Sequence, residues 1–247
     1  MRLYIFAVSL LLCIFTFAAE DKKIDAGILY DEQIPSFAKA QKKIDGIIKS
    51  LEAAGLKTEK IKLSVFETEN RSGISRYRRI YIHNSYRLFS PLIYQGMAEY
   101  VIGGGLIITS SPCFAVDTNE NGTYDKEEMI KGKRKRKSYD WPQNGVFAHS
   151  ATSIKTIKIL FECPLTRGFS QGAVIDENGI MPWTKNKSAE VVVTADTIYK
   201  DKEDLYNLPL LTYKKSGKGA YIYIAYEENE KLFLNCFSNE TFEWLIY

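Results

Sequence analysis

The sequence predicts an α/β fold built on a mostly parallel sheet, and three observations support this. A strand, a helix and a second strand follow one another between residues 26 and 65. This order, with short connections, builds parallel sheets. The run from Leu106 to Thr109 lacks polar alternation, which is typical of a strand buried on both faces. A hairpin pattern from Leu210 to Tyr226 lies near the end of the chain.

The first β-α-β unit starts with Ala26 to Tyr30 (AGILY), the expected first strand. Ser36 caps a helix that runs to about Ala54 with apolar residues at helical spacing, and Gly55 ends it. Thr58 to Val65 is the expected second strand.

The middle of the chain repeats this alternation. Arg79 to His83 (RIYIH) is a third strand that ends in a polar turn. Pro91 to Ile102 is a helix, and three glycines separate it from the fourth strand at Leu106 to Thr109. We expect a polar insertion from Asp117 to about Gln143.

The last part of the chain is richer in strands. Ser153 to Phe161 and Ala189 to Ala195 are expected strands. The hairpin turns through Lys214 to Gly219, and its second arm (AYIYIAY) alternates with a period of two. Asn239 to Ile246 is a closing helix.

The segment from Met1 to Ala19 has the three parts of a cleavable secretory signal peptide. Arg2 is the positive region, Leu3 to Phe17 is the apolar region, and Ala18 and Ala19 precede charged Glu20. The roughly 15 apolar residues fall short of the ~20 that span a bilayer. Cys13 would fit a lipoprotein, but bulky Leu12 precedes it. We therefore expect a secreted or periplasmic protein without a membrane span after signal removal.

Residues 20–247 fit one α/β domain with an insertion at about 117–143, and 45% hydrophobic residues suffice for a full core. Beyond the signal the chain has three widely spaced cysteines, Cys113, Cys163 and Cys236. This is no disulfide framework, and one bridge or three buried thiols both fit the pattern. Two histidines and no CxxC argue against a zinc site.

The sharpest local motif is a twelve-residue loop of the EF-hand type that starts at Asp117. Oxygen ligands at positions 1, 3, 5, 9 and 12, a backbone carbonyl at 7 and glycine at 6 are what calcium requires. The predicted ligands are Asp117, Asn119, Asn121, Thr123, Asp125 and Glu128. We expect a calcium ion in a structural role, although a polar turn without an ion is the alternative, because no entering helix precedes the loop.

A basic run follows this loop, and it comprises Lys131, Lys133, Arg134, Lys135, Arg136 and Lys137. A solvated surface loop is the ordinary explanation for such a block. Clustered cations also attract anionic glycans or other polyanions. No stacking platform accompanies the run, so we do not expect a nucleic acid partner.

Three short motifs carry a resemblance to a known family. They are a helix and strand joined by glycines at residues 97–109, the turn CPLTRGF at 163–169, and the strand SGKGAYIYIA at 216–225. The chain thereby resembles the class I glutamine amidotransferase-like superfamily, in its secreted and glycoside-hydrolase-associated branches. The resemblance implies a three-layer flavodoxin-like sandwich with a mostly parallel central sheet and the C-terminal hairpin.

The catalytic motifs of that superfamily are not matched. Its members place a cysteine in a G-x-C-x-G elbow after the fourth strand, and a His-x-Glu pair further on. Here Ser110 takes the cysteine's position, Cys113 comes three residues late, and His149 has no glutamate two residues on. Because ligands bind at the C-terminal ends of strands in α/β sheets, Ser110 and His83 are further candidates.

Two functions from different classes follow. The first is an exported, non-catalytic binding or accessory domain with a structural calcium ion, and the resemblance implies a role connected with carbohydrate. The second is a secreted hydrolase that uses Ser110 or Cys113 with a histidine at the strand ends. A third possibility is an interaction protein that binds polyanions through the basic run.

Overall fold

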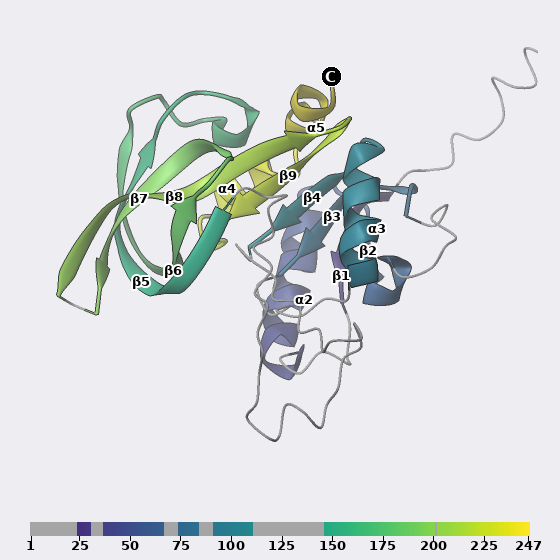
Figure 1. Cartoon of the computed structure of the whole chain (residues 1–247), viewed down its shortest axis with the longest axis horizontal. Coiled ribbons are helices and arrows are strands. Elements are labelled where there is room, and N and C mark those ends of the chain that lie inside the picture. Colours follow the sequence, from purple (N-terminus) through teal and green to yellow (C-terminus); the bar gives the residue numbers. More distant parts are fainter. Residues whose placement is uncertain (1–23, 31–36, 67–73, 84–90, 111–145, 201) are drawn as a thin grey trace, which may run out of the picture.

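In the residues that the structure describes, the fold is a single mixed sheet of nine strands with few helices (Figure 1). The computed structural model describes residues 24–30, 37–66, 74–83, 91–110, 146–200 and 202–247. The α/β class is confirmed for these described residues.

Five strands form the parallel half of the sheet. They are β1 (Ile24–Leu29), β2 (Thr58–Ile61), β3 (Tyr77–Ile82), β4 (Leu106–Thr109) and β9 (Gly219–Ile224). Their order, β2-β1-β3-β4-β9, is that of flavodoxin-like sheets. The three-layer sandwich stays a prediction.

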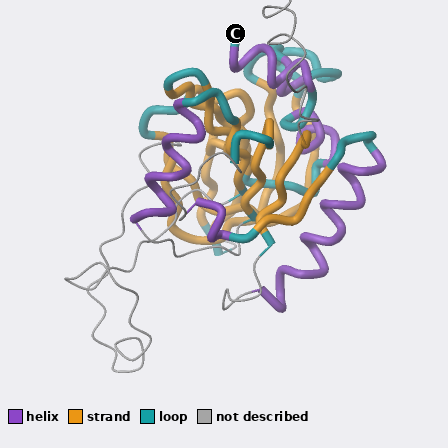
Figure 2. Tube along the Cα trace, turned by 90° about the vertical axis from the view of Figure 1, so that its right-hand side faces the viewer, coloured by secondary structure: helices purple, strands orange, loops and turns teal. Residues whose placement is uncertain are grey.

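Two helices accompany these strands, α2 (Phe37–Ala53) and α3 (Pro91–Ile102), and a short 3-10 helix, η1 (Leu63–Phe66), follows β2. Seen from the side, the helices lie outside the layer of strands (Figure 2). The bounds of α3 and β4 are those predicted from sequence. The glycines between them have a steric reason, because Gly104 has φ of +108° and a Cβ on Gly105 would lie 2.2 Å from the Tyr100 ring.

Four long strands extend the sheet in antiparallel fashion. They are β5 (Val146–Ile159), β6 (Val174–Asn186), β7 (Glu190–Tyr199) and β8 (Glu203–Ser216), and the full strand order is β2-β1-β3-β4-β9-β8-β7-β5-β6. The expectation of a mostly parallel sheet is therefore wrong. Turns too short for a crossover join β7 to β8 and β8 to β9, and such turns allow only antiparallel neighbours. Strand β5 lies between β6 and β7 and pairs antiparallel with both. The predicted hairpin is confirmed as β8 and β9, which turn at Gly217.

The C-terminal helices are α4 (Glu230–Asn235) and α5 (Asn239–Ile246). Fully buried Arg79 on β3 anchors the start of α5, because its guanidinium donates to the Ser238 carbonyl at 3.0 Å and to Asn239 Oδ1 at 2.9 Å. None of the helices in the described part of the chain has the length and apolar character that a membrane span requires.

Candidate functional site

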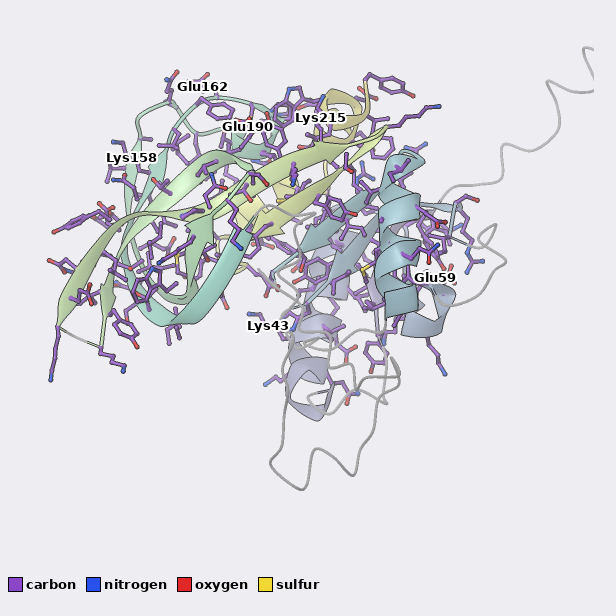
Figure 3. All side chains as sticks on the ribbon, in the orientation of Figure 1. Lys43, Glu59, Lys158, Glu162, Glu190 and Lys215 are labelled. Carbon is purple, nitrogen blue, oxygen red and sulfur yellow. The ribbon has the colours of Figure 1, made fainter. Side chains whose placement is uncertain are left out.

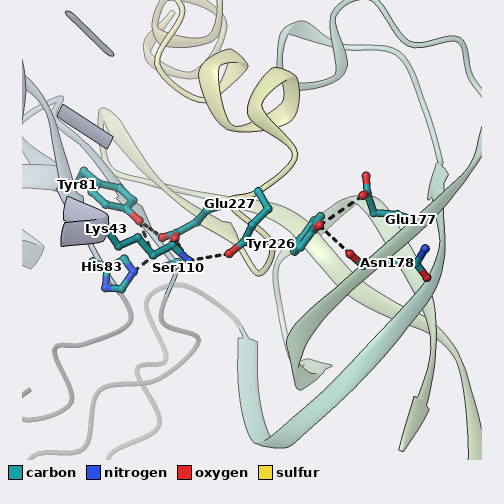
Figure 4. Close-up of polar contacts among 9 residues, drawn as sticks. Lys43, Tyr81, His83, Ser110, Glu177, Asn178, Tyr226 and Glu227 are labelled. Carbon is teal, nitrogen blue, oxygen red and sulfur yellow. Dashed lines mark hydrogen bonds and ion pairs between the residues drawn. The ribbon is translucent and has the colours of Figure 1, made fainter. Parts of the chain in front are cut away.

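Four polar side chains meet where three neighbouring parallel strands end (Figure 4). Tyr81 and His83 come from β3 and the residue after it, Ser110 directly follows β4, and Glu227 lies in the turn after β9. We call these four residues the strand-end cluster. In open α/β sheets this edge is where ligands bind.

The sheet register brings these residues together. Ile82 pairs with Thr109, and Thr109 pairs with Tyr223, so the three strands end side by side. The Ser110 amide donates to the Ile82 carbonyl at 3.2 Å, which continues the ladder by one residue. Both His83 and Ser110 are buried there.

Glu227 is the centre of the cluster. Its side chain is only 5% exposed, and the Tyr81 hydroxyl donates to Oε1. On the other oxygen, Lys43 Nζ from α2 lies 2.9 Å and His83 Nε2 lies 3.4 Å from Oε2. Lys43 also lies 2.8 Å from Glu228 Oε1. Figure 3 shows Lys43 on the side of α2 that faces the antiparallel half.

Aromatic packing fixes Tyr81 in this position. Its ring meets Phe233 of α4 edge-on, with centroids 5.5 Å apart, and Phe237 at 5.9 Å. Its hydroxyl lies 3.4 Å from Ser110 Oγ as well as contacting Glu227. Tyr81 therefore joins the serine to the carboxylate.

Burial changes the acidity of the two central groups in opposite ways. It raises the pKa of Glu227 to about 7, against the attraction of Lys43. Burial, and then the charge of Lys43, lowers the pKa of His83 to about 4. At neutral pH the imidazole is therefore uncharged, while the carboxyl is close to half-protonated.

The pKa of Lys43 changes in the direction opposite to the effect of burial. Burial acts to lower it, but the two carboxylates Glu227 and Glu228 outweigh burial, so the pKa is raised. Lys43 therefore remains a cation beside the buried acid.

A second group of polar residues continues from Glu227 toward β6 (Figure 4). The Tyr226 hydroxyl lies 3.2 Å from the Asn178 carbonyl and 3.4 Å from Glu177 Oε1. Asn229 Nδ2 lies 3.4 Å from Glu177 Oε2. Gly179 leaves room for the Tyr226 ring, since a Cβ there would lie 2.3 Å from it. These contacts link the turn after β9 to the edge strand.

The cluster is suited to bind hydroxyl-bearing ligands and to move protons. It combines the carboxyl group of Glu227 with hydroxyl and imidazole groups, and the ammonium of Lys43 lies beside them. A serine hydrolase relay places histidine between serine and carboxylate. Here the described contacts place Glu227 centrally, with Tyr81 leading to Ser110 and Nε2 of His83 facing the carboxylate.

The residues expected from sequence are placed as follows. His83 and Ser110 share the strand-end cluster, while a catalytic role for either stays a prediction. His149 lies in β5, a strand separated from β4 by β9, β8 and β7, and its side chain lies outside the described ones. Cys113, the calcium-type loop from Asp117 and the basic run all lie outside the described residues. Among the described residues no group of three His, Cys, Asp or Glu could hold a metal ion.

Sequence reasoning missed Tyr81, Lys43 and Glu227. A signal for Glu227 was present, because an acidic stretch directly follows the alternating strand AYIYIAY. An acid at the C-terminal end of a parallel strand is a candidate ligand-binding group. Lys43 gave no such signal, because it lies on a helix whose exposed face is rich in lysine.

Solved structures share this fold at low sequence identity. A β-galactosidase from Rahnella sp. R3 is 13% identical with a TM-score of 0.58, over 88% of this chain and 31% of that chain. A β-galactosidase from Bacillus circulans is 16% identical with a TM-score of 0.57, over 87% and 31%. The chain thus spans about a third of these enzymes.

A ThuA-like protein from Bacteroides uniformis has nearly the same extent as this chain. It is 12% identical with a TM-score of 0.54, over 90% of this chain and 93% of that one. ThuA-like proteins have a class I glutamine amidotransferase-like fold. No family model matches the chain, and no curated protein matches it.

Proposed function

We propose that the protein is an exported binding or accessory protein whose strand-end cluster holds a hydroxyl-rich ligand of the carbohydrate class. The observation that carries the proposal is the buried carboxyl of Glu227, which is contacted by Tyr81, His83 and Lys43 at the ligand-binding edge of the sheet. Burying an acid is costly unless its partners compensate. Binding of a ligand would be a functional reason to keep the carboxyl of Glu227 buried at this edge of the sheet.

The chemistry of the cluster supports a polyol. Sugar hydroxyls both donate and accept hydrogen bonds, and the cluster offers both kinds of partner close together. The likeness in fold to two β-galactosidases supports carbohydrate over other polar ligands. We further infer a three-layer, flavodoxin-like sandwich of the amidotransferase type, which the strand order β2-β1-β3-β4-β9 supports.

Two parts of the proposal rest on sequence motifs alone. The loop from Asp117 to Glu128 holds a structural calcium ion, and the segment from Met1 to Ala19 directs export. Free calcium is high outside cells, so a weak site of this type would be filled there.

Titration calorimetry with a panel of neutral disaccharides, including lactose as a β-galactoside, tests the proposal. We expect saturable binding that Glu227→Gln weakens by about tenfold or more, which is the effect of about 1.4 kcal/mol. Tyr100→Phe is the matched control, because it removes a tyrosine hydroxyl that bonds to the Tyr77 carbonyl outside the cluster. No saturable heat with any sugar would refute the carbohydrate class.

The second candidate function is hydrolysis, and the raised pKa of Glu227 favours it. An acid with a pKa of about 7 can both accept and give a proton at neutral pH. Glu227 would then act on Ser110 through Tyr81. Labelling by a serine-directed fluorophosphonate that is lost in Ser110→Ala would establish this function and displace the non-catalytic one, whereas absence of labelling in the folded chain would exclude it.

A further inference from the structure

Two cysteines lie on segments that pack against each other. Cys163 begins the turn that contains the 3-10 helix η3 (Pro164–Thr166), and Cys236 caps the C-terminus of α4. Both are free thiols in the structure. They lie far apart in the sequence, and neither belongs to the strand-end cluster.

Hydrogen bonds hold the two segments in contact. Asn235, the residue before Cys236, donates through Nδ2 to the carbonyls of Leu165 at 3.2 Å and Arg167 at 3.0 Å. Lys231 Nζ on the same helix donates to the Gly168 carbonyl at 2.6 Å. The turn after Cys163 is thus fixed along the length of α4.

The turn also fixes Cys163 itself. Its amide donates to Thr166 Oγ1 at 2.9 Å, and this fully buried hydroxyl lies 3.8 Å from the Cys163 sulfur. Cys236 is fully buried, and Cys163 is half-buried against the same core. Burial, and then the charge of Cys163, raises the pKa of Cys236, whose thiol donates to the Leu232 carbonyl at 3.4 Å.

We propose that Cys163 and Cys236 form a disulfide when the chain folds in the presence of an external disulfide. The Cys163 thiolate attacks one sulfur of that reagent, its S–S bond breaks, and one thiolate leaves. The Cys236 thiolate then attacks the Cys163 sulfur in the mixed disulfide and releases the second thiolate. Two protein thiols are oxidised, the external disulfide is reduced to two thiols, and the two protons pass to them.

The order of events follows from burial. Cys163 is accessible for the first attack, whereas Cys236 in the folded core is a poor nucleophile. The bridge therefore closes during folding, before α4 seals Cys236. It would tie the turn at 163–169 to the helix that closely follows Glu227, and so stabilise the segment that carries the site.

Peptide mapping tests the pairing without any substitution. The full chain is refolded in reduced and oxidised glutathione, alkylated and cleaved with trypsin. The four cysteines of the full chain fall on different peptides, residues 3–22, 88–126, 159–167 and 232–247. We expect residues 159–167 joined to residues 232–247, with two hydrogens fewer than the separate peptides, and Cys113 alkylated.

Thermal melts give the second readout. The oxidised wild type should melt about 5–10 °C above Cys163→Ser, as expected for a bridge that closes a long loop. Cys113→Ser should melt like the wild type, and dithiothreitol should remove the difference. Alkylated Cys163 and Cys236 after oxidation, or a bridge from Cys113 to either one, would overturn the proposal.

Discussion

The hydroxyl of Tyr81 donates a hydrogen bond to the carboxyl group of Glu227, and this contact joins β3 to the turn after β9. The two residues are 146 positions apart in the chain. Because Tyr81 is held by Phe233 and Phe237, the acid has a rigid donor. Disturbing either residue should therefore affect both stability and ligand binding.

Glu227→Gln should change how stability depends on pH. Burial raises the pKa of Glu227 from its ordinary value of 4.5 to about 7. Between these values the folded state keeps a proton that the unfolded state releases, so the contribution of Glu227 to stability falls as the pH rises from about 4.5 to 7. The fall is of the order of 3 kcal/mol and should be absent in Glu227→Gln. Urea denaturation at a series of pH values measures it.

His83 supplies the control for this experiment. Its pKa is lowered from 6.5 to about 4, so its contribution is full above pH 6.5 and is lost as the pH falls toward 4. The two groups oppose each other, and the wild-type profile should be shallow over this range. Glu227→Gln should expose the rise due to His83, and His83→Gln the fall due to Glu227. Parallel profiles for all three proteins would contradict the assignment.

Tyr81→Phe should destabilise the fold by about 1–3 kcal/mol, because it removes the hydroxyl donor to a buried carboxyl. It should also weaken any sugar bound in calorimetry. Tyr100→Phe loses a hydrogen bond of similar kind and should lower stability while leaving binding unchanged. Equal effects of the two variants on binding would show that Tyr81 acts through stability alone.

Gly179→Ala should destabilise the fold and disturb Tyr226. A Cβ at this position would lie 2.3 Å from the tyrosine ring, and the ring is buried. We expect a loss of about 1–3 kcal/mol in chemical denaturation. The matched control is Gly46→Ala in the middle of α2, where a Cβ meets nothing within 4 Å. That change should stabilise by about 0.5–1 kcal/mol, and a loss there instead would undermine the comparison.

Calcium should raise the melting temperature of the chain, provided that the loop from Asp117 to Glu128 binds it. A site with a dissociation constant of about 0.1–1 mM stabilises the folded state by about 1–2 kcal/mol at about 5 mM calcium. Asp117→Ala should abolish the shift, and magnesium at the same concentration should produce little of it. An unchanged melt with calcium and with chelator would leave the loop a polar turn.

Local pattern predicted much of the fold. The bounds of α3, β4 and α5 follow from apolar periodicity and from their flanking glycine and serine residues. The strands of the antiparallel half were harder to predict from local pattern. Strand β6 contains Asp176, Glu177, Gly179 and Pro182, residue types that disfavour strands, and it forms at the edge of the sheet, where a proline without an N–H is tolerated.

The candidate site was also predictable from local pattern only in part. His83 and Ser110 could be placed at strand ends because each directly follows a recognisable apolar strand. Lys43 could not, because it lies on a distant helix and meets the cluster only through tertiary packing. Tyr81 lies on the same predicted strand as His83, and Glu227 follows the last predicted strand, but the contact between them depends on packing of segments 146 residues apart. The raised pKa of Glu227 depends on burial by these distant segments, and no local pattern reports it.

Titration of the glutamate carboxyl carbons by NMR tests the central claim, that Glu227 is the buried centre of a ligand site. We expect one resonance with a midpoint near pH 7, absent in Glu227→Gln and shifted when a disaccharide that binds in calorimetry is added. If every glutamate titrates near the ordinary value of about 4.3, Glu227 is not buried as described and the proposed site is wrong.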